Sequence, residues 1–323
     1  MGSQYPNSLF LLLWGMWGKT AINSFILISG WFLCNSSLSW QRVFKLWFQI
    51  KLYQILIFII LLFAGYETLT WGSVKYICLS NLISVNNGFT ASFMAFYIFV
   101  PFYNKLIKSM NKRSHGWLVA GLLLYFSVAS TLLRANSMNE PFWYMTLYFI
   151  ASYLRLYPIK WCESLRCSWG CFSIGFVLGV ASVLYMIFAG SSNFYYFVSD
   201  SNKILALWVG LSAFLVAKNS KQFVSPLINT LAAGCFGVLL IHANSNAMRT
   251  WLWLDFVNVP NAFFMDLSML IGYSVLVSIT IFLVCTGIDY GYRKLIEKPT
   301  MQYVHKHSGK IENVFQSLLK RFF

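Results

Sequence analysis

Long apolar runs, separated by short polar connections, follow one another along most of this chain. A helix needs roughly 20 apolar residues to cross the hydrocarbon core of a bilayer, and it satisfies its own backbone hydrogen bonds there. The pattern therefore predicts an all-α, polytopic integral membrane protein with nine transmembrane helices. The predicted spans are 9–34, 43–65, 89–107, 117–133, 142–157, 169–190, 204–217, 229–242 and 262–288.

The seventh and eighth predicted spans are short, and the eighth, 229–242, also contains two glycines and a histidine. Membrane proteins tend to place their sites at short or glycine-interrupted helices. The region around this span is therefore the first place to look for functional chemistry.

Lysines and arginines cluster in alternate connections between these spans. The connections after the first, third, fifth and seventh spans, the helix ends beside them and the tail after residue 288 hold 19 of the 24 Lys and Arg residues. Because positive charge stays in the cytoplasm, this alternation predicts an external amino terminus and a cytoplasmic carboxyl terminus. The five cations outside this set are Lys19, Lys75, Arg134, Lys203 and Arg249.

The composition excludes an ordinary soluble protein. Hydrophobic residues make up 58% of the chain and charged residues only 10%, against about 25% charged in soluble domains. The 13 Trp and 18 Tyr residues suit a protein that lines two membrane interfaces. The net charge of +15 is scattered in short clusters between apolar runs, so we predict no nucleic-acid partner.

The seven cysteines form no CxxC pair, and most of them lie in or beside apolar runs. We interpret them as small buried hydrophobic residues rather than a disulfide or metal framework, and we predict no metal site. The first eight residues lack the basic region and cleavage site of a signal peptide. We therefore expect the first apolar run to be a retained span.

The end of the chain, residues 305–323, places apolar residues at helical spacing among basic ones. This pattern predicts an amphipathic helix on the inner membrane surface, with a frayed tail as the alternative. We accordingly predict a transmembrane domain over 1–300 and a cytoplasmic, basic tail over 301–323.

His242 lies inside an apolar segment and is the first candidate for catalysis. An imidazole can take and give a proton near neutral pH, so His242 is suited to act as a general base. Alternatively, it is a polar group that holds helices together, the commoner role for a lone histidine in an apolar segment. Asn244, Asn246 and Arg249 follow it within one or two turns, and this gathering of polar groups at one helix end favours a site.

Three further residues have a functional and a structural interpretation. Arg155, at the cytoplasmic end of its span, could bind a phosphate of a cofactor or simply fix the topology. Asn23, within a span, could bind substrate or hydrogen-bond across helices. Lys19, near the outer end of the same span, could meet a substrate or snorkel to the interface.

Asp289, Arg293 and Glu297 repeat at four-residue intervals, so we expect an ion-paired helix end there. No Ser-His-Asp order, paired inward carboxylates or HExxH motif is present. The residue patterns alone therefore lead to a polytopic membrane protein with a polar cluster near its predicted outer face.

Five segments carry a resemblance to a known family. They are GKTAINSFILISGWFLC (18–34), FYIFVPFYNKLI (96–107), FIASYLRLYP (149–158), FGVLLIHANSNAMRTWLW (236–253) and GIDYGYRKLIEKP (287–299). In this order, and across nearly the whole chain, they resemble motifs of the membrane acyltransferase-3 family.

The resemblance implies a multi-pass enzyme of the bacterial inner membrane. Such enzymes transfer an acyl group, usually acetyl from acetyl-CoA, to hydroxyl groups of surface polysaccharides or other envelope glycans. The implied partners are membrane lipids and a glycan or lipid-linked saccharide acceptor. On this basis His242 is expected to be the base and Arg155 to contact acyl-CoA. The residues expected near the acceptor are Asn23, Lys19, Asn244 and Arg249.

One departure from the family pattern concerns the amino terminus. The family normally has ten helices, and the first bears an arginine and the histidine thought to act in catalysis. Here about twenty residues precede the first matching motif, and they contain neither Arg nor His. A misplaced start codon, a remnant without activity, and a variant that uses His242 instead would each account for this.

Two other functions share these features. A transporter or flippase of lipid-linked saccharides also needs many spans and aromatic girdles, but no acyl donor. A catalytically inactive acyltransferase relative, retained as a partner protein, would keep the fold without the chemistry.

Overall fold

The computed structural model describes residues 5–79, 88–135 and 138–322. These residues are helical with no strand, and helix accounts for 80% of the structure. The all-α fold class predicted from the apolar runs is therefore confirmed.

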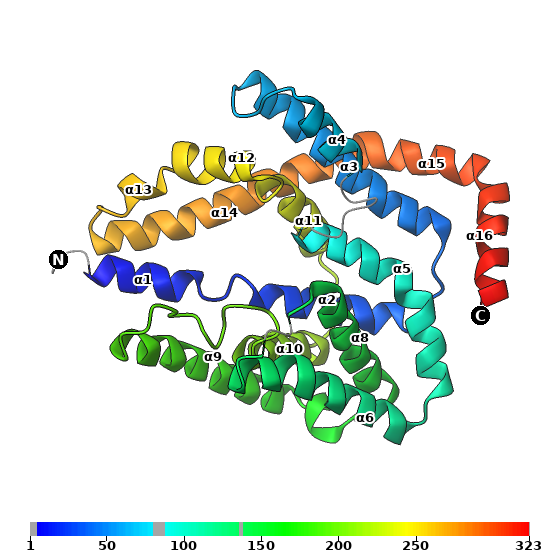
Figure 1. Cartoon of the computed structure of the whole chain (residues 1–323), viewed down its shortest axis with the longest axis horizontal. Coiled ribbons are helices and arrows are strands. Elements are labelled where there is room, and N and C mark those ends of the chain that lie inside the picture. The colour runs from blue at the N-terminus through cyan, green and yellow to red at the C-terminus, as the bar shows by residue number, and fades with distance from the viewer. Residues whose placement is uncertain (1–4, 80–87, 136–137, 323) are drawn as a thin grey trace. The chain divides into compact units, whose positions relative to one another are not determined.

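Contacts within the chain group the helices, which are labelled in Figure 1, into two compact units. Unit 1 comprises three stretches of chain, Met1–Phe10, Leu38–Met94 and Phe223–Phe322. Unit 2 comprises Leu11–Ser37 and Ala95–Gln222. The domain boundary predicted at residue 300 falls inside helix α15 (Lys298–His307).

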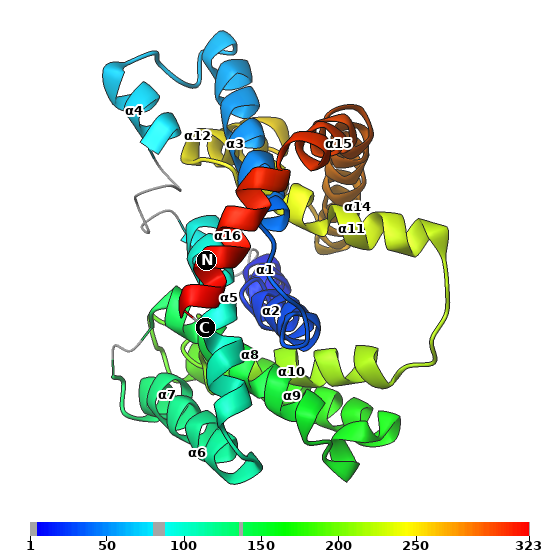
Figure 2. The same cartoon turned by 90° about the vertical axis from the view of Figure 1, so that its right-hand side faces the viewer.

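Unit 2 is a bundle around α8 (Glu140–Leu156). Its other helices are α2 (Thr20–Leu33), α6 (Lys112–Leu123), η1 (Leu124–Ala129), α7 (Ser130–Leu132), η2 (Lys160–Glu163), α9 (Leu165–Phe188) and α10 (Ile204–Asn219). It also holds the end of α1 (Tyr5–Gly15) and most of α5 (Gly88–Ser109). Helix α10 packs against both α9 and α2, and α2 packs against α8 (Figure 2).

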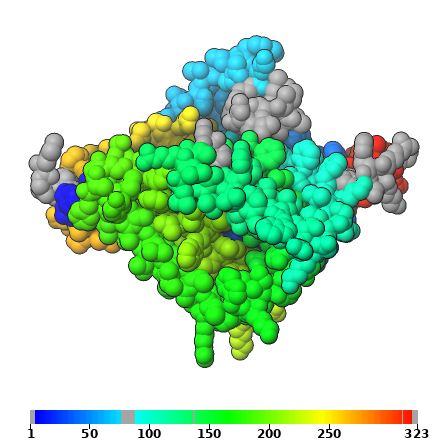
Figure 3. Space-filling model, turned by 60° about the horizontal axis from the view of Figure 1, so that its bottom comes forward, coloured from blue at the N-terminus to red at the C-terminus, as the bar shows by residue number. Residues whose placement is uncertain are grey.

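The core of unit 2 is aromatic. Trp143, Tyr144, Tyr148 and Phe149 of α8 are all buried, and Phe96 of α5 joins them. Large rings bury much apolar area while losing few rotatable bonds, so one face of α8 anchors the bundle. Helix α9, by contrast, carries large hydrophobic side chains on the surface of this unit, coloured green in Figure 3.

Unit 1 is built on α3 (Trp40–Phe63), α11 (Pro226–His242) and α14 (Leu267–Tyr292). Its remaining helices are α4 (Trp71–Leu79), α12 (Asn246–Arg249), η3 (Thr250–Phe256), α13 (Val259–Ala262), η4 (Arg293–Glu297), α15 and α16 (Gly309–Phe322). Its core joins residues such as Ile57, Ile241 and Cys285, one from each of the three main helices.

Helix α16 lies where the sequence predicts an amphipathic helix, and part of it docks on the start of α3. Glu312 accepts a hydrogen bond from the backbone N–H of Trp40 at 3.0 Å, and Gln316 donates to the carbonyl of Leu38 at 3.1 Å. Phe315 packs on the Trp40 ring, with centroids 6.2 Å apart. The helix therefore satisfies part of the α3 amino terminus; its place on a membrane stays a prediction.

Five helices in the described residues are long and apolar enough to cross a membrane, and a sixth span is possible if a bent pair is counted as one. The five are Tyr5–Leu33, Trp40–Phe63, Lys112–Leu132, Leu165–Phe188 and Leu267–His307. The bent pair is Pro226–His242 with Asn246–Phe256, at 98°. Helices α8 and α10 match predicted spans in position but have only 17 and 16 residues.

Candidate functional site

The 98° bend of unit 1 falls directly after His242, at the end of α11. Residues 243–245 connect α11 to α12, and Ser245 caps the second helix by accepting a hydrogen bond from the N–H of Met248 at 3.1 Å. A break of this kind ends one helical hydrogen-bond ladder and starts another, which exposes backbone groups to a ligand. The polar cluster predicted around His242 therefore sits on a discontinuous helix.

His242 is half-buried, and its Nδ1 atom lies 2.6 Å from the carbonyl oxygen of Val238. A carbonyl oxygen can only accept, so Nδ1 carries the hydrogen in this bond. In the neutral ring the lone pair then resides on Nε2. His242 is thus held in the tautomer that leaves Nε2 to accept a proton.

A cavity of about 580 Å³ lies next to this bend, within unit 1. Two of the predicted acceptor residues, Asn244 and Arg249, line it, while His242 adjoins it in sequence without lining it. Asn244 donates back to the carbonyl of Leu240 at 2.9 Å. Glu67, from the connection after α3, adds a carboxylate that the sequence patterns did not single out. We call this the bend cavity.

A second cavity in unit 1, of about 880 Å³, is basic. Its charged and titratable residues come from the start of α3 and from the end of the chain: Arg42, Lys45, Arg293, Glu297, Lys298 and His305. Glu297 is paired with Lys45 at 2.8 Å. The remaining charge is positive, so this basic cavity is suited to an anionic ligand.

A buried hydrogen-bond network adjoins the basic cavity. Asp289 is fully buried and accepts from Gln49 Nε2 at 3.2 Å, from the Tyr53 hydroxyl at 3.0 Å and from Arg293 Nε at 2.7 Å. With both carboxylate oxygens occupied, Asp289 fixes the guanidinium of Arg293 at the cavity wall. A Cβ atom on Gly237 of α11 would overlap the Asp289 carboxylate, so only glycine allows α11 to pass this close.

The ion pairs expected along 289–297 are partly confirmed. Asp289 and Arg293 pair as predicted, whereas Glu297 pairs with Lys45 of α3. Residues 293–297 form a π-helical segment, whose hydrogen bonds run from i to i+5. Residues four apart therefore no longer stack on one face, and Glu297 turns to a partner on another helix.

The predicted cofactor contact, Arg155, lies in unit 2 among aromatic rings. Its guanidinium donates to the carbonyl oxygen of Trp31 and lies 5.2 Å from the Trp31 ring centroid. Lys218 lies over the same ring at 5.4 Å and pairs with Glu163 at 2.6 Å. These contacts support the structural interpretation of Arg155, and a role in binding acyl-CoA stays a prediction.

Asn23 is fully buried in unit 2 and is hydrogen-bonded on both sides of its amide. It donates to the carbonyls of Ser201 and Ala206 at 2.7 and 3.1 Å, and it accepts from the indole of Trp143 at 3.0 Å. It therefore hydrogen-bonds across helices, the commoner of the two expected roles. Lys19 is exposed, directly before α2.

A second histidine, which the sequence patterns did not single out, is buried in unit 2. His242 lies inside an apolar segment of the sequence but is only half-buried, whereas His115 of α6 is fully buried. The Nε2 atom of His115 lies 3.1 Å from the carbonyl oxygen of Phe149. His115 is buried because α6 packs on α8. Its neighbours in the sequence are polar, so the sequence pattern gives no sign of this burial.

Comparisons with models of protein families, with curated proteins and with solved structures gave no match. The basis for a functional proposal is therefore the geometry above and the resemblance of the five sequence segments.

Among the described residues, no cluster of three or more His, Cys, Asp or Glu side chains could hold a metal ion. Six cysteines in the same part of the chain are free thiols, three of them buried.

Proposed function

We propose that this chain is a membrane-bound acyltransferase. It would move an acyl group, with acetyl-CoA as the donor, to hydroxyl groups of a cell-surface polysaccharide or another envelope glycan. The observation that carries this proposal is the pair of cavities in unit 1, which open at different levels of the same two helices.

The spacing of the two cavities supports a donor and an acceptor that meet between them. On α11, Ala233 lines the basic cavity and Leu239 lines the bend cavity, and the helix rises about 9 Å between them. On α3, Gln49 lines the basic cavity and the next residue, Ile50, lines the bend cavity. Two substrates bound at these levels would approach each other without sharing an entrance.

The basic cavity fits the donor. Coenzyme A carries phosphate groups, which guanidinium and ammonium groups bind well. Arg293, held by Asp289, and Lys298 of α15 are suited to this task. These residues belong to the set that the charge alternation assigns to the cytoplasm, where acetyl-CoA is available. We therefore propose Arg293 and Lys298 as donor contacts.

The bend cavity fits the acceptor. Asn244 and Arg249, which line it, would orient the saccharide, and His242, directly before the lining residue Ala243, would act through Nε2. In the proposed step, Nε2 removes the proton from an acceptor hydroxyl while the oxygen attacks the thioester carbonyl. The C–S bond then breaks, the acyl group stays on the sugar oxygen, and the thiolate takes up the proton from His242.

The membrane arrangement that goes with this proposal has nine spans, an external amino terminus and a cytoplasmic carboxyl terminus in the inner membrane. The charge alternation supports this orientation, and the bend cavity then faces outward together with Arg249.

The test is transfer of labelled acetyl from acetyl-CoA to deacetylated envelope polysaccharide, measured with the full-length protein in proteoliposomes. We expect His242→Ala to lower kcat by about 10²–10⁴-fold, the usual contribution of a general base. His307→Ala is a matched control, because His307 also bonds through Nδ1 to the carbonyl four residues back, at 2.9 Å, on exposed helix α15. Full activity of His242→Ala would overturn the base assignment, and no transfer by the unaltered protein would overturn the proposed function.

One observation also favours a transporter of lipid-linked saccharides. Transporters commonly bind substrate at discontinuous helices, and the 98° bend after His242 is one. This alternative predicts loss of glycan export on deletion of the gene, with no acetyl transfer in proteoliposomes. A catalytically inactive relative would lack both activities.

A further inference from the structure

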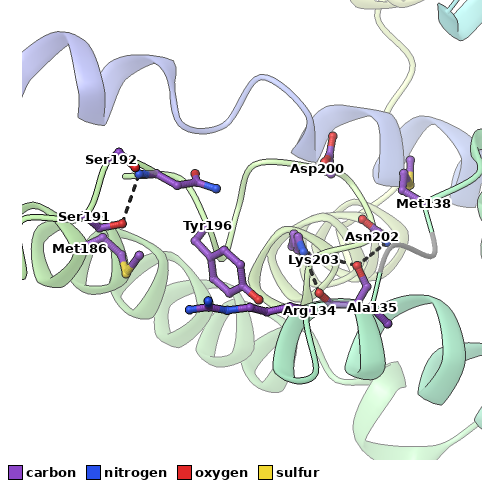
Figure 4. Close-up of a pocket in the computed structure, with 12 residues that line it drawn as sticks. Arg134, Ala135, Met138, Met186, Ser191, Ser192, Tyr196, Asp200, Asn202 and Lys203 are labelled. Carbon is purple, nitrogen blue, oxygen red and sulfur yellow. Dashed lines mark hydrogen bonds between the residues drawn. The ribbon is translucent and has the colours of Figure 1, made fainter.

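A third cavity lies in unit 2, and none of its lining residues belongs to the proposed donor or acceptor site. It has a volume of about 500 Å³, within the range of small-molecule sites. It lies where α7 and α9 end and α10 begins, so three helix termini meet around it (Figure 4). The residues that line it are Ser130, Arg134, Ala135, Met138, Met186, Ser191, Ser192, Asn193, Tyr196, Asp200, Asn202 and Lys203.

Two cations in this cavity share one aromatic ring. The guanidinium of Arg134 lies 5.6 Å and the Lys203 ammonium 4.9 Å from the centroid of Tyr196. The Tyr196 hydroxyl donates to the carbonyl of Thr131 at 2.6 Å, which fixes the ring. Lys203 in turn donates to the carbonyl of Ser130 at 2.8 Å. Figure 4 shows all three labelled side chains around the same space.

Arg134 adopts a backbone conformation that normally belongs to glycine. Its φ is +54°, at the point where the chain leaves α7. Across the cavity, the chain leaves α9 through Gly190 at φ +67°. The left-handed region costs free energy for any residue with a side chain. Strained positions of this kind cluster at functional sites, so the arginine here indicates that its side chain has a function.

The rest of the cavity wall is rich in hydrogen-bonding groups. Ser191, Ser192 and Asn193 contribute hydroxyl and amide groups from the loop after α9. Asn202 is fully buried, and its Oδ1 atom meets no hydrogen-bond donor among the described residues. Asp200 is the one carboxylate among the described lining residues, so the cavity keeps a net positive charge.

We propose that this cavity binds an acidic sugar residue, with its carboxylate between Arg134 and Lys203 and its hydroxyl groups on the serine and asparagine side chains. The described part of the wall carries two cations and a single carboxylate, that of Asp200, so its charge favours an anionic ligand. The many hydroxyl and amide groups favour a polyhydroxylated ligand over a plain lipid tail. Burial lowers the pKa of Lys203, opposed by Asp200, and a bound carboxylate would raise that pKa again.

The identity of the ligand rests on the proposed function, because an envelope glycan supplies acidic sugars on the side where these cations are predicted to lie. The binding itself does not depend on acyl transfer. Binding can therefore be measured without an acyl donor, and its result stands whether or not transfer is found.

The experiment is calorimetric titration of the purified full-length protein, in uncharged detergent, with a tetrasaccharide that contains glucuronic acid. Its carboxyl-reduced form is the second ligand. We expect the acidic form to bind and Arg134→Gln or Lys203→Gln to weaken it by about ten- to a hundredfold, the loss of one charge-assisted hydrogen bond. Lys75→Gln, an exposed cation on the same predicted face that does not line the cavity, is the matched control.

Three outcomes would overturn the proposal. The folded protein, judged by its thermal unfolding, could fail to bind the tetrasaccharide. The carboxyl-reduced form could bind equally well, which would remove the role of the cations. Phosphatidylglycerol added to the micelles could displace the tetrasaccharide and itself depend on Arg134 and Lys203, which would make the cavity a lipid headgroup site.

Discussion

Some single residues have strained backbones that lower the stability of the fold, and Arg134 is the clearest case. Its left-handed backbone, φ +54°, disfavours every residue with a Cβ atom by about 1–2 kcal/mol. The side chain gains a contact with Tyr196 in return, which is worth about 0.5–1 kcal/mol at an exposed site. The backbone strain exceeds the gain from the ring contact, so arginine at this position lowers the stability of the fold.

We therefore expect Arg134→Gly to raise the free energy of unfolding by roughly 0.5–1 kcal/mol, measured by thermal unfolding in detergent. Gly190→Ala is the matched control: φ is +67° there, and no atom lies within 4 Å of an added Cβ. That substitution should lower stability by about 1 kcal/mol. A loss of stability in Arg134→Gly would mean that the ring contact outweighs the backbone strain.

The sequence indicated which residue types carry chemistry, but not their partners. His242, Asn244 and Arg249 were found because they adjoin in the sequence at a helix end. Asn23 stands out in the sequence as a polar residue within an apolar run. Its hydrogen-bond acceptors, the carbonyls of residues 201 and 206, lie far along the chain, and the sequence does not indicate them. Glu67 gave no signal, because a single acid in a connection is ordinary until a cavity forms around it.

At the scale of elements, α11 and α14 approach so closely that one position admits only glycine. A Cβ atom at Gly237 would overlap the Asp289 carboxylate, and Asp289 cannot retreat without leaving Gln49, Tyr53 and Arg293. The contact between the two helices and the buried network are therefore a single feature.

We expect Gly237→Ala to destabilise the protein by about 2–4 kcal/mol, since it combines overpacking with a disrupted buried network. The measurement is the thermal unfolding midpoint in detergent. Gly291→Ala on α14 is the control, because no atom lies within 4 Å of its added Cβ and alanine favours a helix by about 0.5–1 kcal/mol. Equal midpoints for the two variants would contradict the close approach.

Helix positions were predicted well from the apolar pattern, and helix breaks were predicted in part. Span 229–242 ends at the residue where α11 ends, since Ala-Asn-Ser interrupts the apolar run. The start of the same helix was predicted at 229, three residues late, because the Ser225 cap and Pro226 were not used. The π-helical turn at 293–297 has no such local signature, and so the partner of Glu297 was not foreseen.

At the scale of the whole molecule, the apolar surfaces of several helices require a bilayer around them. Large hydrophobic side chains of α9 and α14 are exposed, among them Phe176, Tyr185, Leu276 and Leu283. The predicted orientation places the start of α9 inside the cell and its end, beside Ser192, outside.

Labelling with a membrane-impermeant maleimide tests this orientation. In variants that keep a single cysteine, we expect Ser192→Cys to react in intact spheroplasts and Cys167 to react only after the membrane is opened. Both positions are exposed in the structure, so the membrane alone should separate them. Labelling of Cys167 from outside would reverse the orientation and with it the assignment of the cavities.

The interleaving of the two units along the chain has a consequence for biosynthesis. Helix α3 is made early, but its partners α11 and α14 begin at residues 226 and 267. Asp289 of α14 follows the end of α3 by 226 residues, so at about 5–20 residues per second roughly 11–45 seconds pass before it is made. During that interval Gln49 and Tyr53 are in the nascent chain without Asp289, and they need another polar partner in the membrane until it arrives. The insertion machinery, or a chaperone with polar groups at membrane depth, would have to shelter α3 for that time.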